Sequence, residues 1–225
     1  MEVKLINYTP EPELAVAAAA RLCYADVSAA QLRERMKASQ VESLLRRVVS
    51  SGHHSVLEHA SFTFAADGLS RAASHQLVRH RLASYSQQSQ RWVSFSQPSF
   101  VTPPAIAAKA DLSAEYEEAV LAAFSLYRRL REAGIAAEDA RYILPNAWTT
   151  RIVITMNARE LLHVCGLRLC PRAQWEIRQL FVLAKREVAR VAPLLAQYLQ
   201  PKCIPMGFCD EEESCGIRPK REQSP

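Results

Sequence analysis

The chain has 225 residues, with 28 basic and 23 acidic side chains, a formal net charge of +5 and 49% hydrophobic residues. This composition is typical of a globular protein of about one domain, and it excludes a largely disordered or fibrous chain. The longest unbroken apolar stretch, Leu14 to Ala20, is far shorter than the roughly 20 residues that a membrane span needs. No basic-then-apolar leader follows Met1, so we expect a soluble, cytoplasmic protein without membrane partners, whose six cysteines are reduced.

The N-terminal quarter predicts one strand followed by helices. Apolar and polar residues alternate over Glu2–Tyr8, which favours a strand. Helical periodicity follows in three segments, namely Pro12–Cys23, Ala29–Met36 and Val41–Ser50.

A second strand and a basic helix are predicted next. Phe62 and Phe64 alternate with small polar residues, which predicts a strand over Ala60–Ala66 that ends in a turn at Asp67-Gly68. Ser70 is a favourable N-cap for a helix that would run to about Arg81. In that helix three basic residues would share one face: Arg71, His75 and Arg79.

The remainder alternates between a long loop, helices and a strand. Leu82–Pro104 is rich in Ser and Gln and predicts a loop with a short strand near Arg91–Phe95. The further predicted elements are a helix over Asp111–Ala133, a strand over Thr149–Met156, a helix over Ala158–Leu167 and a long helix over Pro171–Leu199 that Pro193 would bend. This order predicts an α+β fold, with a central, mostly antiparallel sheet flanked by long helices and a helical extension. Residues 1–200 would form one domain, and residues 201–225 a tail with cysteines and both acidic and basic side chains.

Charge is distributed unevenly along the chain. No carboxylate occurs between Asp67 and Asp111, whereas five basic residues do, namely Arg71, Arg79, Arg81, Arg91 and Lys109. Within this stretch, the segment Arg79–Arg91 places two guanidinium groups beside a histidine and follows them with hydroxyl and amide side chains. Guanidinium forks hold phosphate well, and neutral donors can read the edge of a ring. The segment therefore predicts a site for a phosphorylated ligand.

The same segment resembles the signature of the flavin-dependent thymidylate synthases, because Arg79-His80-Arg81 is followed after seven residues by Ser89 and then by Arg91. Further segments resemble the family in order and approximate spacing: Gly52–His59, Ala140–Pro145, Asn157–Arg159, Leu167–Arg168 and Ala173–Ile177. The resemblance covers about residues 1–200. It implies a homotetramer with active sites shared between subunits, which methylates dUMP to dTMP with FAD, 5,10-methylenetetrahydrofolate and NADPH.

The resemblance also implies the roles of individual residues. The positions that match flavin contacts are Ser55, Arg79, His80, Arg81, Gln87, Asn157, Ala158, Arg159 and His163. The positions that match dUMP contacts are Gln76, Arg79, Gln87, Gln88, Ser89, Gln90, Arg91, Arg141 and Arg168. Among these, Arg91 and Arg141 would hold the phosphate, and Arg168 would act in catalysis by favouring the ionised uracil ring. Many members have Glu where this chain has Gln87, so a proton-transfer role at that position is not expected here.

Two other functions are alternatives to this one. Tyr85, Trp92 and Phe95 are interleaved with arginines, which is typical of a module that binds single-stranded nucleic acid through the Arg79–Arg91 segment. A zinc hydrolase is disfavoured, because the spacing of His54, Glu58 and His59 does not match H-x-x-E-H.

The tail region carries cysteines that the family resemblance does not explain: Cys170, Cys203, Cys209 and Cys215. Four thiolates could hold one tetrahedral zinc ion. Their spacing is wider than the two to four residues usual between zinc ligands, which favours free or buried thiols instead. The sequence leaves both interpretations open.

Overall fold

The structure is a computed structural model, and it describes residues 1–221. Within these residues a four-stranded antiparallel sheet has the order β1-β2-β4-β3, which confirms the predicted α+β class. The strands are β1 (Glu2–Tyr8), β2 (Ser61–Ser70), β3 (Ala83–Gln87) and β4 (Thr149–Asn157). No helix in residues 1–221 is both long and apolar enough to cross a membrane.

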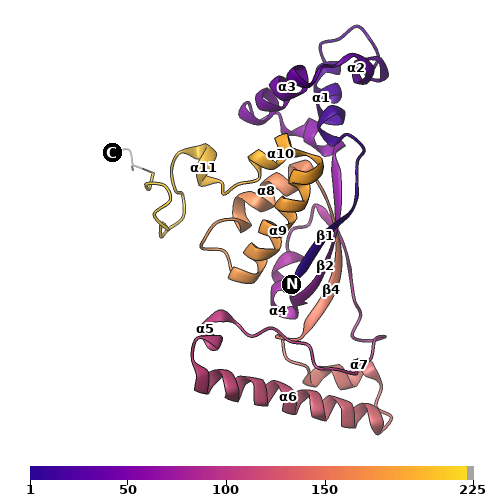
Figure 1. Cartoon of the computed structure of the whole chain (residues 1–225), viewed down its shortest axis with the longest axis vertical. Coiled ribbons are helices and arrows are strands. Elements are labelled where there is room, and N and C mark those ends of the chain that lie inside the picture. The colour runs from indigo at the N-terminus through magenta and orange to yellow at the C-terminus, as the bar shows by residue number, and fades with distance from the viewer. Residues whose placement is uncertain (222–225) are drawn as a thin grey trace. The chain divides into compact units, whose positions relative to one another are not determined.

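The chain forms two compact units, which we describe separately. The first unit comprises Met1–Glu2, Ala66–Arg79 and Tyr85–Val153. Its helices are α4 (Arg71–Leu77), α5 (Pro104–Ala107), α6 (Ala110–Glu132), α7 (Ala137–Ala140) and the 3-10 helix η2 (Arg141–Ile143). The long helix α6 lies beside α7 (Figure 1).

An aromatic core holds the first unit together. Phe124 and Tyr127 on α6 pack with Ala140 and the fully buried Trp148, and Phe95 packs against this cluster. The Phe124 and Trp148 rings are stacked with their centroids 5.2 Å apart. This packing fixes the segment that leads from α7 through Arg141 to the start of β4.

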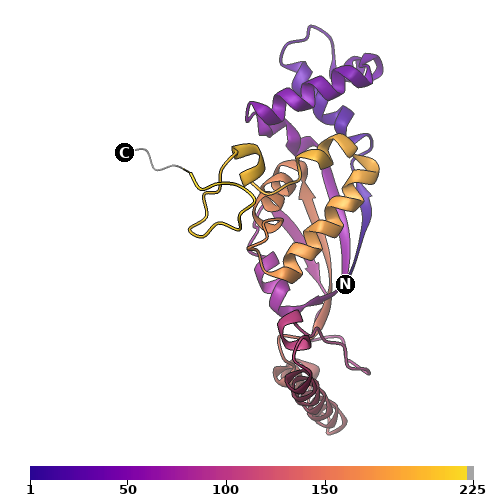
Figure 2. The ribbon, with the colours of Figure 1, turned by 60° about the vertical axis from the view of Figure 1, so that its left-hand side comes forward.

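The second unit comprises Val3–Ala65, His80–Ser84 and, among the described residues, 154–221. Its helices are α1 (Pro12–Leu22), α2 (Ala29–Arg35), α3 (Ala38–Ser50), the 3-10 helix η1 (His54–His59), α8 (Ala158–Arg168), α9 (Trp175–Val191), α10 (Pro193–Tyr198) and α11 (Cys203–Met206). Helices α1 and α3 pack together, and α9 packs against α8 and α10 (Figures 1 and 2).

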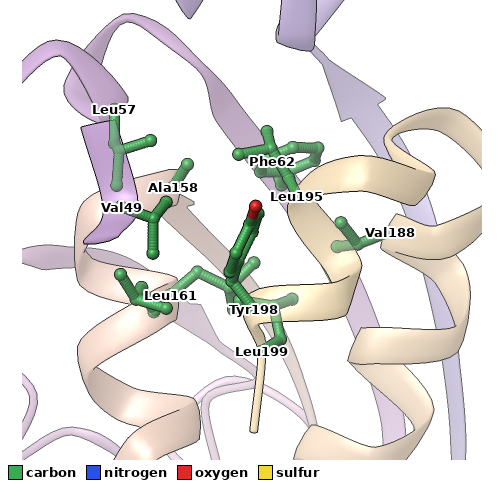
Figure 3. Close-up of a pocket in the computed structure, with 10 residues that line it drawn as sticks. Val49, Leu57, Phe62, Ala158, Leu161, Val188, Leu195, Tyr198 and Leu199 are labelled. Atoms are coloured by element: carbon green, nitrogen blue, oxygen red, sulfur yellow. The ribbon is translucent and has the colours of Figure 1, made fainter. Parts of the chain in front are cut away.

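The core of the second unit anchors the start of α8. Ala158 at the first position of α8, Leu57 on η1 and Phe62 on β2 are buried around a small gap that Leu195 and Tyr198 of α10 also line (Figure 3). The gap measures about 10 Å³, so it is an imperfection of packing and too small for an organic ligand. Its apolar lining holds α8 and η1 in place, and both elements carry predicted flavin contacts.

Two predicted boundaries around the basic segment were wrong. Helix α4 ends at Leu77 and not near Arg81, so Arg71, His75 and Arg79 do not form one helical face. The short strand lies at Ala83–Gln87 and not at Arg91–Phe95, because β3 pairs with the distant strand β4, which no local pattern indicates.

Other boundaries also differ from the predictions. Strand β2 continues through Gly68, whose φ of 77° suits glycine and whose added Cβ would lie 3.4 Å from the Met1 backbone. Helix α9 begins at Trp175 and not at Pro171, because the side chain of Gln174 accepts hydrogen bonds from the backbone N–H groups of Glu176 and Ile177. Pro193 does not merely bend this helix but separates α9 from α10.

Candidate functional site

Two arginines of the first unit contact Glu138, and a third arginine lies within reach of the charge of one of them. The Arg91 Nε lies 2.5 Å from the Glu138 carboxylate, and the Arg141 Nε donates to the backbone carbonyl of Glu138 at 3.0 Å. Burial lowers the pKa of Arg71, and the positive charge of Arg141 lowers it further. We call Arg71, Arg91, Glu138 and Arg141 the Glu138 cluster. With three cations and one carboxylate, this cluster attracts an anion.

The Glu138 cluster brings together the two residues predicted to hold phosphate, Arg91 and Arg141. Sequence reasoning missed Arg71 and Glu138 as members. The stretch without carboxylates was the signal for Arg71, because a half-buried arginine beside another arginine points to an anionic partner.

The loop after β3 carries the predicted neutral contacts to dUMP. The Gln88 N–H donates to the Arg151 carbonyl at 2.8 Å, which continues the pairing of β3 with β4. The Ser89 Oγ accepts from the Arg91 N–H at 3.1 Å, a local turn that fixes the approach of Arg91 to the Glu138 cluster. Gln90 is half-buried in the same loop.

Gln87 and the α4 region frame this loop. The Gln87 amide nitrogen donates to the Ser74 Oγ at 3.0 Å and to the Thr150 Oγ1 at 3.2 Å. Gln87 therefore ties β3 to α4 and β4, and its amide NH₂ is already engaged within the protein. Gln76 is half-buried on α4, and Arg79 is exposed in the turn beyond the end of that helix.

In the second unit, the start of α8 and η1 form another group of predicted contacts. Asn157 caps α8 by accepting from the Glu160 N–H at 2.9 Å. Arg159 is exposed and pairs with Glu58 of η1 at 2.5 Å. Ser55 is exposed on η1, and His163 is exposed one helical turn after Arg159.

His80 and Arg168 form a buried contact at the other end of α8. The Arg168 Nε donates to the His80 Nε2 at 2.9 Å, and His80 is only 6% exposed. Burial above all, and then the charges of Arg168 and His163, lower the pKa of His80 to about 4. His80 is therefore neutral at pH 7, with its Nε2 as the acceptor and its proton on Nδ1. A neutral histidine that accepts a hydrogen bond from a half-buried guanidinium fixes the orientation of that positive charge. Arg81, the next residue, is exposed.

A cavity of about 390 Å³ opens beside Ser55 in the second unit. Arg21 at the end of α1, Arg47 at the end of α3 and His53 line it together with the apolar Ala20 and Val56. Cationic and apolar groups on one cavity suit the phosphates and rings of a dinucleotide such as FAD. The sequence offered no signal for Arg21 and Arg47, because each is an ordinary basic residue of a helix C-terminus.

The structure does not favour a stacking platform for nucleic acid. The Tyr85 hydroxyl donates to the Leu77 carbonyl at 2.9 Å, and the Phe95 ring packs against Trp148 with centroids 5.4 Å apart. Of the three aromatic residues that motivated this alternative, Trp92 alone is exposed. One exposed ring does not supply a row of bases with stacking partners.

Comparisons with known proteins agree with the resemblance seen in the sequence. The family described as thymidylate synthase complementing protein matches residues 4–194. The flavin-dependent thymidylate synthase of Geobacter sulfurreducens is 54% identical over 94% of this chain and 91% of the relative. That of Pyrococcus horikoshii is 45% identical over 95% of this chain and 91% of the relative. Among solved structures, the UMP/dUMP methylase PolB from Streptomyces cacaoi, bound with 5-Br dUMP, superimposes with a TM-score of 0.80 at 26% identity. The match covers 88% of this chain and 93% of that chain.

Proposed function

Because the chain belongs to the flavin-dependent thymidylate synthase family, we propose that it methylates dUMP to dTMP, with 5,10-methylenetetrahydrofolate as the carbon donor and NADPH as the reductant. The observation that carries the proposal is the 54% identity over 94% of the chain to a protein of that name. The Glu138 cluster and the His80–Arg168 contact give it a physical basis in this chain.

The Glu138 cluster is proposed to bind the phosphate of dUMP. A nucleotide monophosphate carries close to two negative charges, and guanidinium forks match its oxygens in geometry. Arg91 would exchange its ion pair with Glu138 for the phosphate, while Arg141 keeps its hydrogen bond to the backbone. Ser89 would contribute a hydroxyl beside Arg91, as a binding group and not as a nucleophile, since its Oγ accepts from the Arg91 backbone N–H and does not donate to a base.

Arg168 is proposed to stabilise negative charge on the uracil ring. A guanidinium held in a fixed direction counts most when charge develops on the ring in the transition state. His80 supplies that direction through its bond to the Arg168 Nε, which leaves the terminal nitrogens of the fork for the ligand.

FAD fits the residues of the second unit. Ser55 and the cavity lined by Arg21 and Arg47 would hold its phosphates, and Arg159 and His163 on α8 would contact its other parts. When bound, FAD supplies the hydride chemistry of the reaction. The chain's own residues bind and orient the reactants.

We further propose a homotetramer with shared active sites. Several large apolar side chains are highly exposed on the single chain, among them Tyr142 at 84% and Trp92 at 77%. Both lie in segments that carry predicted dUMP contacts, and a partner subunit would cover them. Light scattering on the purified protein should give about four times 25.2 kDa, and a monomer at all concentrations would contradict this. A cytoplasmic location stays a prediction, based on six free thiols and no disulfide.

A single-turnover experiment tests the activity directly. Protein loaded with FAD is reduced chemically without oxygen and mixed with dUMP and methylenetetrahydrofolate, and dTMP is measured by chromatography. We expect about one dTMP per bound flavin, because the reduced cofactor carries one hydride equivalent. A folded, FAD-loaded tetramer that forms no dTMP would contradict the proposal.

A further inference from the structure

The described part of the tail, residues 201–221, has almost no apolar core. It contains the four-residue helix α11 and an irregular loop. Its only buried residues are Cys203 and Cys209, each 6% exposed. So little apolar burial does not offset the entropy of fixing about twenty residues, at roughly 1–2 kcal/mol each. Another interaction is needed to hold this segment.

Four cysteines from separate parts of the second unit converge beside the tail. Cys170 follows the end of α8, and Cys203, Cys209 and Cys215 come from the tail. All four line one small cavity of about 10 Å³. None of these cysteines forms a disulfide.

The backbone of the tail explains how wide cysteine spacings reach a common point. The Cys209 N–H donates to the Pro219 carbonyl at 2.7 Å, and the Arg221 N–H donates back to the Cys209 carbonyl at 3.3 Å. Gly207 ends α11 with a φ of 80°, and Gly216 follows Cys215 with a φ of 87°. Both glycines adopt a left-handed conformation that turns the chain back on itself. The turn at Gly207 lies between Cys203 and Cys209, and the turn at Gly216 directly follows Cys215, before the chain returns to pair with Cys209 at Pro219 and Arg221.

Charged side chains surround the same cavity. Lys202 pairs with Asp210 at 3.0 Å and with Glu211 at 2.9 Å inside the tail, whereas Arg172 pairs with Glu213 at 2.9 Å and so connects the tail to the body of the second unit. These pairs are exposed or half-buried, so each contributes little by itself. The cavity is lined by three cations, Arg172, Lys202 and Arg218, and by two carboxylates, Asp210 and Glu211.

We propose that Cys170, Cys203, Cys209 and Cys215 bind one Zn²⁺ ion as four thiolates, which joins the tail to the turn between α8 and α9. Thiolates in a tetrahedral set select zinc among the common divalent ions. In residues 1–221, no group of three or more His, Cys, Asp or Glu side chains already has metal-binding geometry. Binding therefore includes rotation of the cysteine side chains until each sulfur lies about 2.3 Å from the ion, with release of the thiol protons.

Metal content is the first test. The full chain is expressed without a histidine tag in medium containing zinc, and zinc, iron and flavin are measured on the same sample. We expect about one zinc per chain, as for a closed Cys₄ site. Less than about a tenth of an equivalent, both as purified and after anaerobic incubation of the reduced protein with ZnSO₄, would overturn the proposal. Iron in place of zinc would overturn the choice of metal.

Variants test the ligands. Cys209→Ser should lose the zinc and expose Lys202 and Arg218 to trypsin. Cys23→Ser is the control for these two measurements only and should retain both zinc and protection, because Cys23 lies outside the cavity of the four cysteines and lines the separate cavity near Ser55. Cys170 lies outside the tail, so Cys170→Ser tests the same site if Cys209→Ser folds poorly. Co²⁺ substituted into the unmodified protein should show the thiolate charge-transfer absorption of a tetrahedral sulfur site. Zinc retained in both Cys209→Ser and Cys170→Ser would contradict the assignment. Flavin content separates these outcomes from any failure of the thymidylate synthase activity.

Discussion

The His80–Arg168 contact predicts that stability falls in mild acid. The pKa of His80 is about 4 in the folded protein, mainly because the ring is buried, whereas the pKa of an unperturbed histidine is 6.5. Between about pH 6.5 and pH 4, His80 is protonated in the unfolded chain but not in the folded protein, so the free energy of unfolding decreases as the pH falls through this window. Above about pH 6.5 the ring is neutral in both states, and the full stability is present.

The size of the effect follows from the two pKa values. At pH 5 the full difference between the folded and unfolded pKa values corresponds to a loss of about 2 kcal/mol in the free energy of unfolding. Solvent screening of the ring reduces this loss to on the order of 1 kcal/mol. His80→Gln keeps a side chain that can accept from Arg168 but removes the titration. Urea unfolding at pH 7.5 and pH 5 should therefore show a loss for the unmodified protein that exceeds the loss for His80→Gln by about 1 kcal/mol.

The comparison between the two proteins isolates His80, because the other five histidines are the same in both. Equal losses in the two proteins would refute the reasoning, as would an NMR titration that places the His80 pKa near 6.5.

The same contact predicts a catalytic effect. His80→Leu leaves the half-buried Arg168 without its acceptor, so single-turnover dTMP formation should fall by about tenfold or more, as for loss of a charge-assisted hydrogen bond. An unchanged rate in a variant with full flavin content would show that His80 does not position Arg168.

Three further predictions concern binding and stability. Arg141→Ala should weaken dUMP binding by about 10- to 100-fold, as measured by calorimetric titration. Arg141→Lys should restore only part of the affinity, because a guanidinium can bond the phosphate and the Glu138 carbonyl at the same time and an ammonium cannot match that geometry. Full recovery of affinity in Arg141→Lys would contradict a geometric role. Ser89→Ala should weaken dUMP binding by about 2- to 10-fold and keep turnover, whereas lost turnover with normal affinity would indicate a nucleophile. Glu13→Ala should lower the free energy of unfolding in urea by about 0.5–2 kcal/mol, because Glu13 caps α10 by accepting from the Leu194 and Leu195 N–H groups. Glu13→Gln keeps an acceptor oxygen and should lose less stability. Equal losses in the two variants would argue against this capping role.

The sequence by itself determined the elements that carry their own local signals. Helix α6 has a long apolar stripe, α8 begins after the capping Asn157, and β4 is a run of β-branched residues, so each was predicted to within a few residues. The Arg79–Arg91 segment identified the family, because a motif of fixed spacing is a property of the chain before it folds.

Only the tertiary structure decided which of these residues meet. Strand β3 forms at Ala83–Gln87 because its backbone pairs with β4, and α4 ends at Leu77 ahead of the turn that leads there. Arg91 and Arg141 share Glu138, and His80 accepts from Arg168, although each pair is far apart in sequence. Hydrogen bonds and ion pairs of this kind depend on distances of about 3 Å, which packing of the whole chain sets and which periodicity and propensity do not encode.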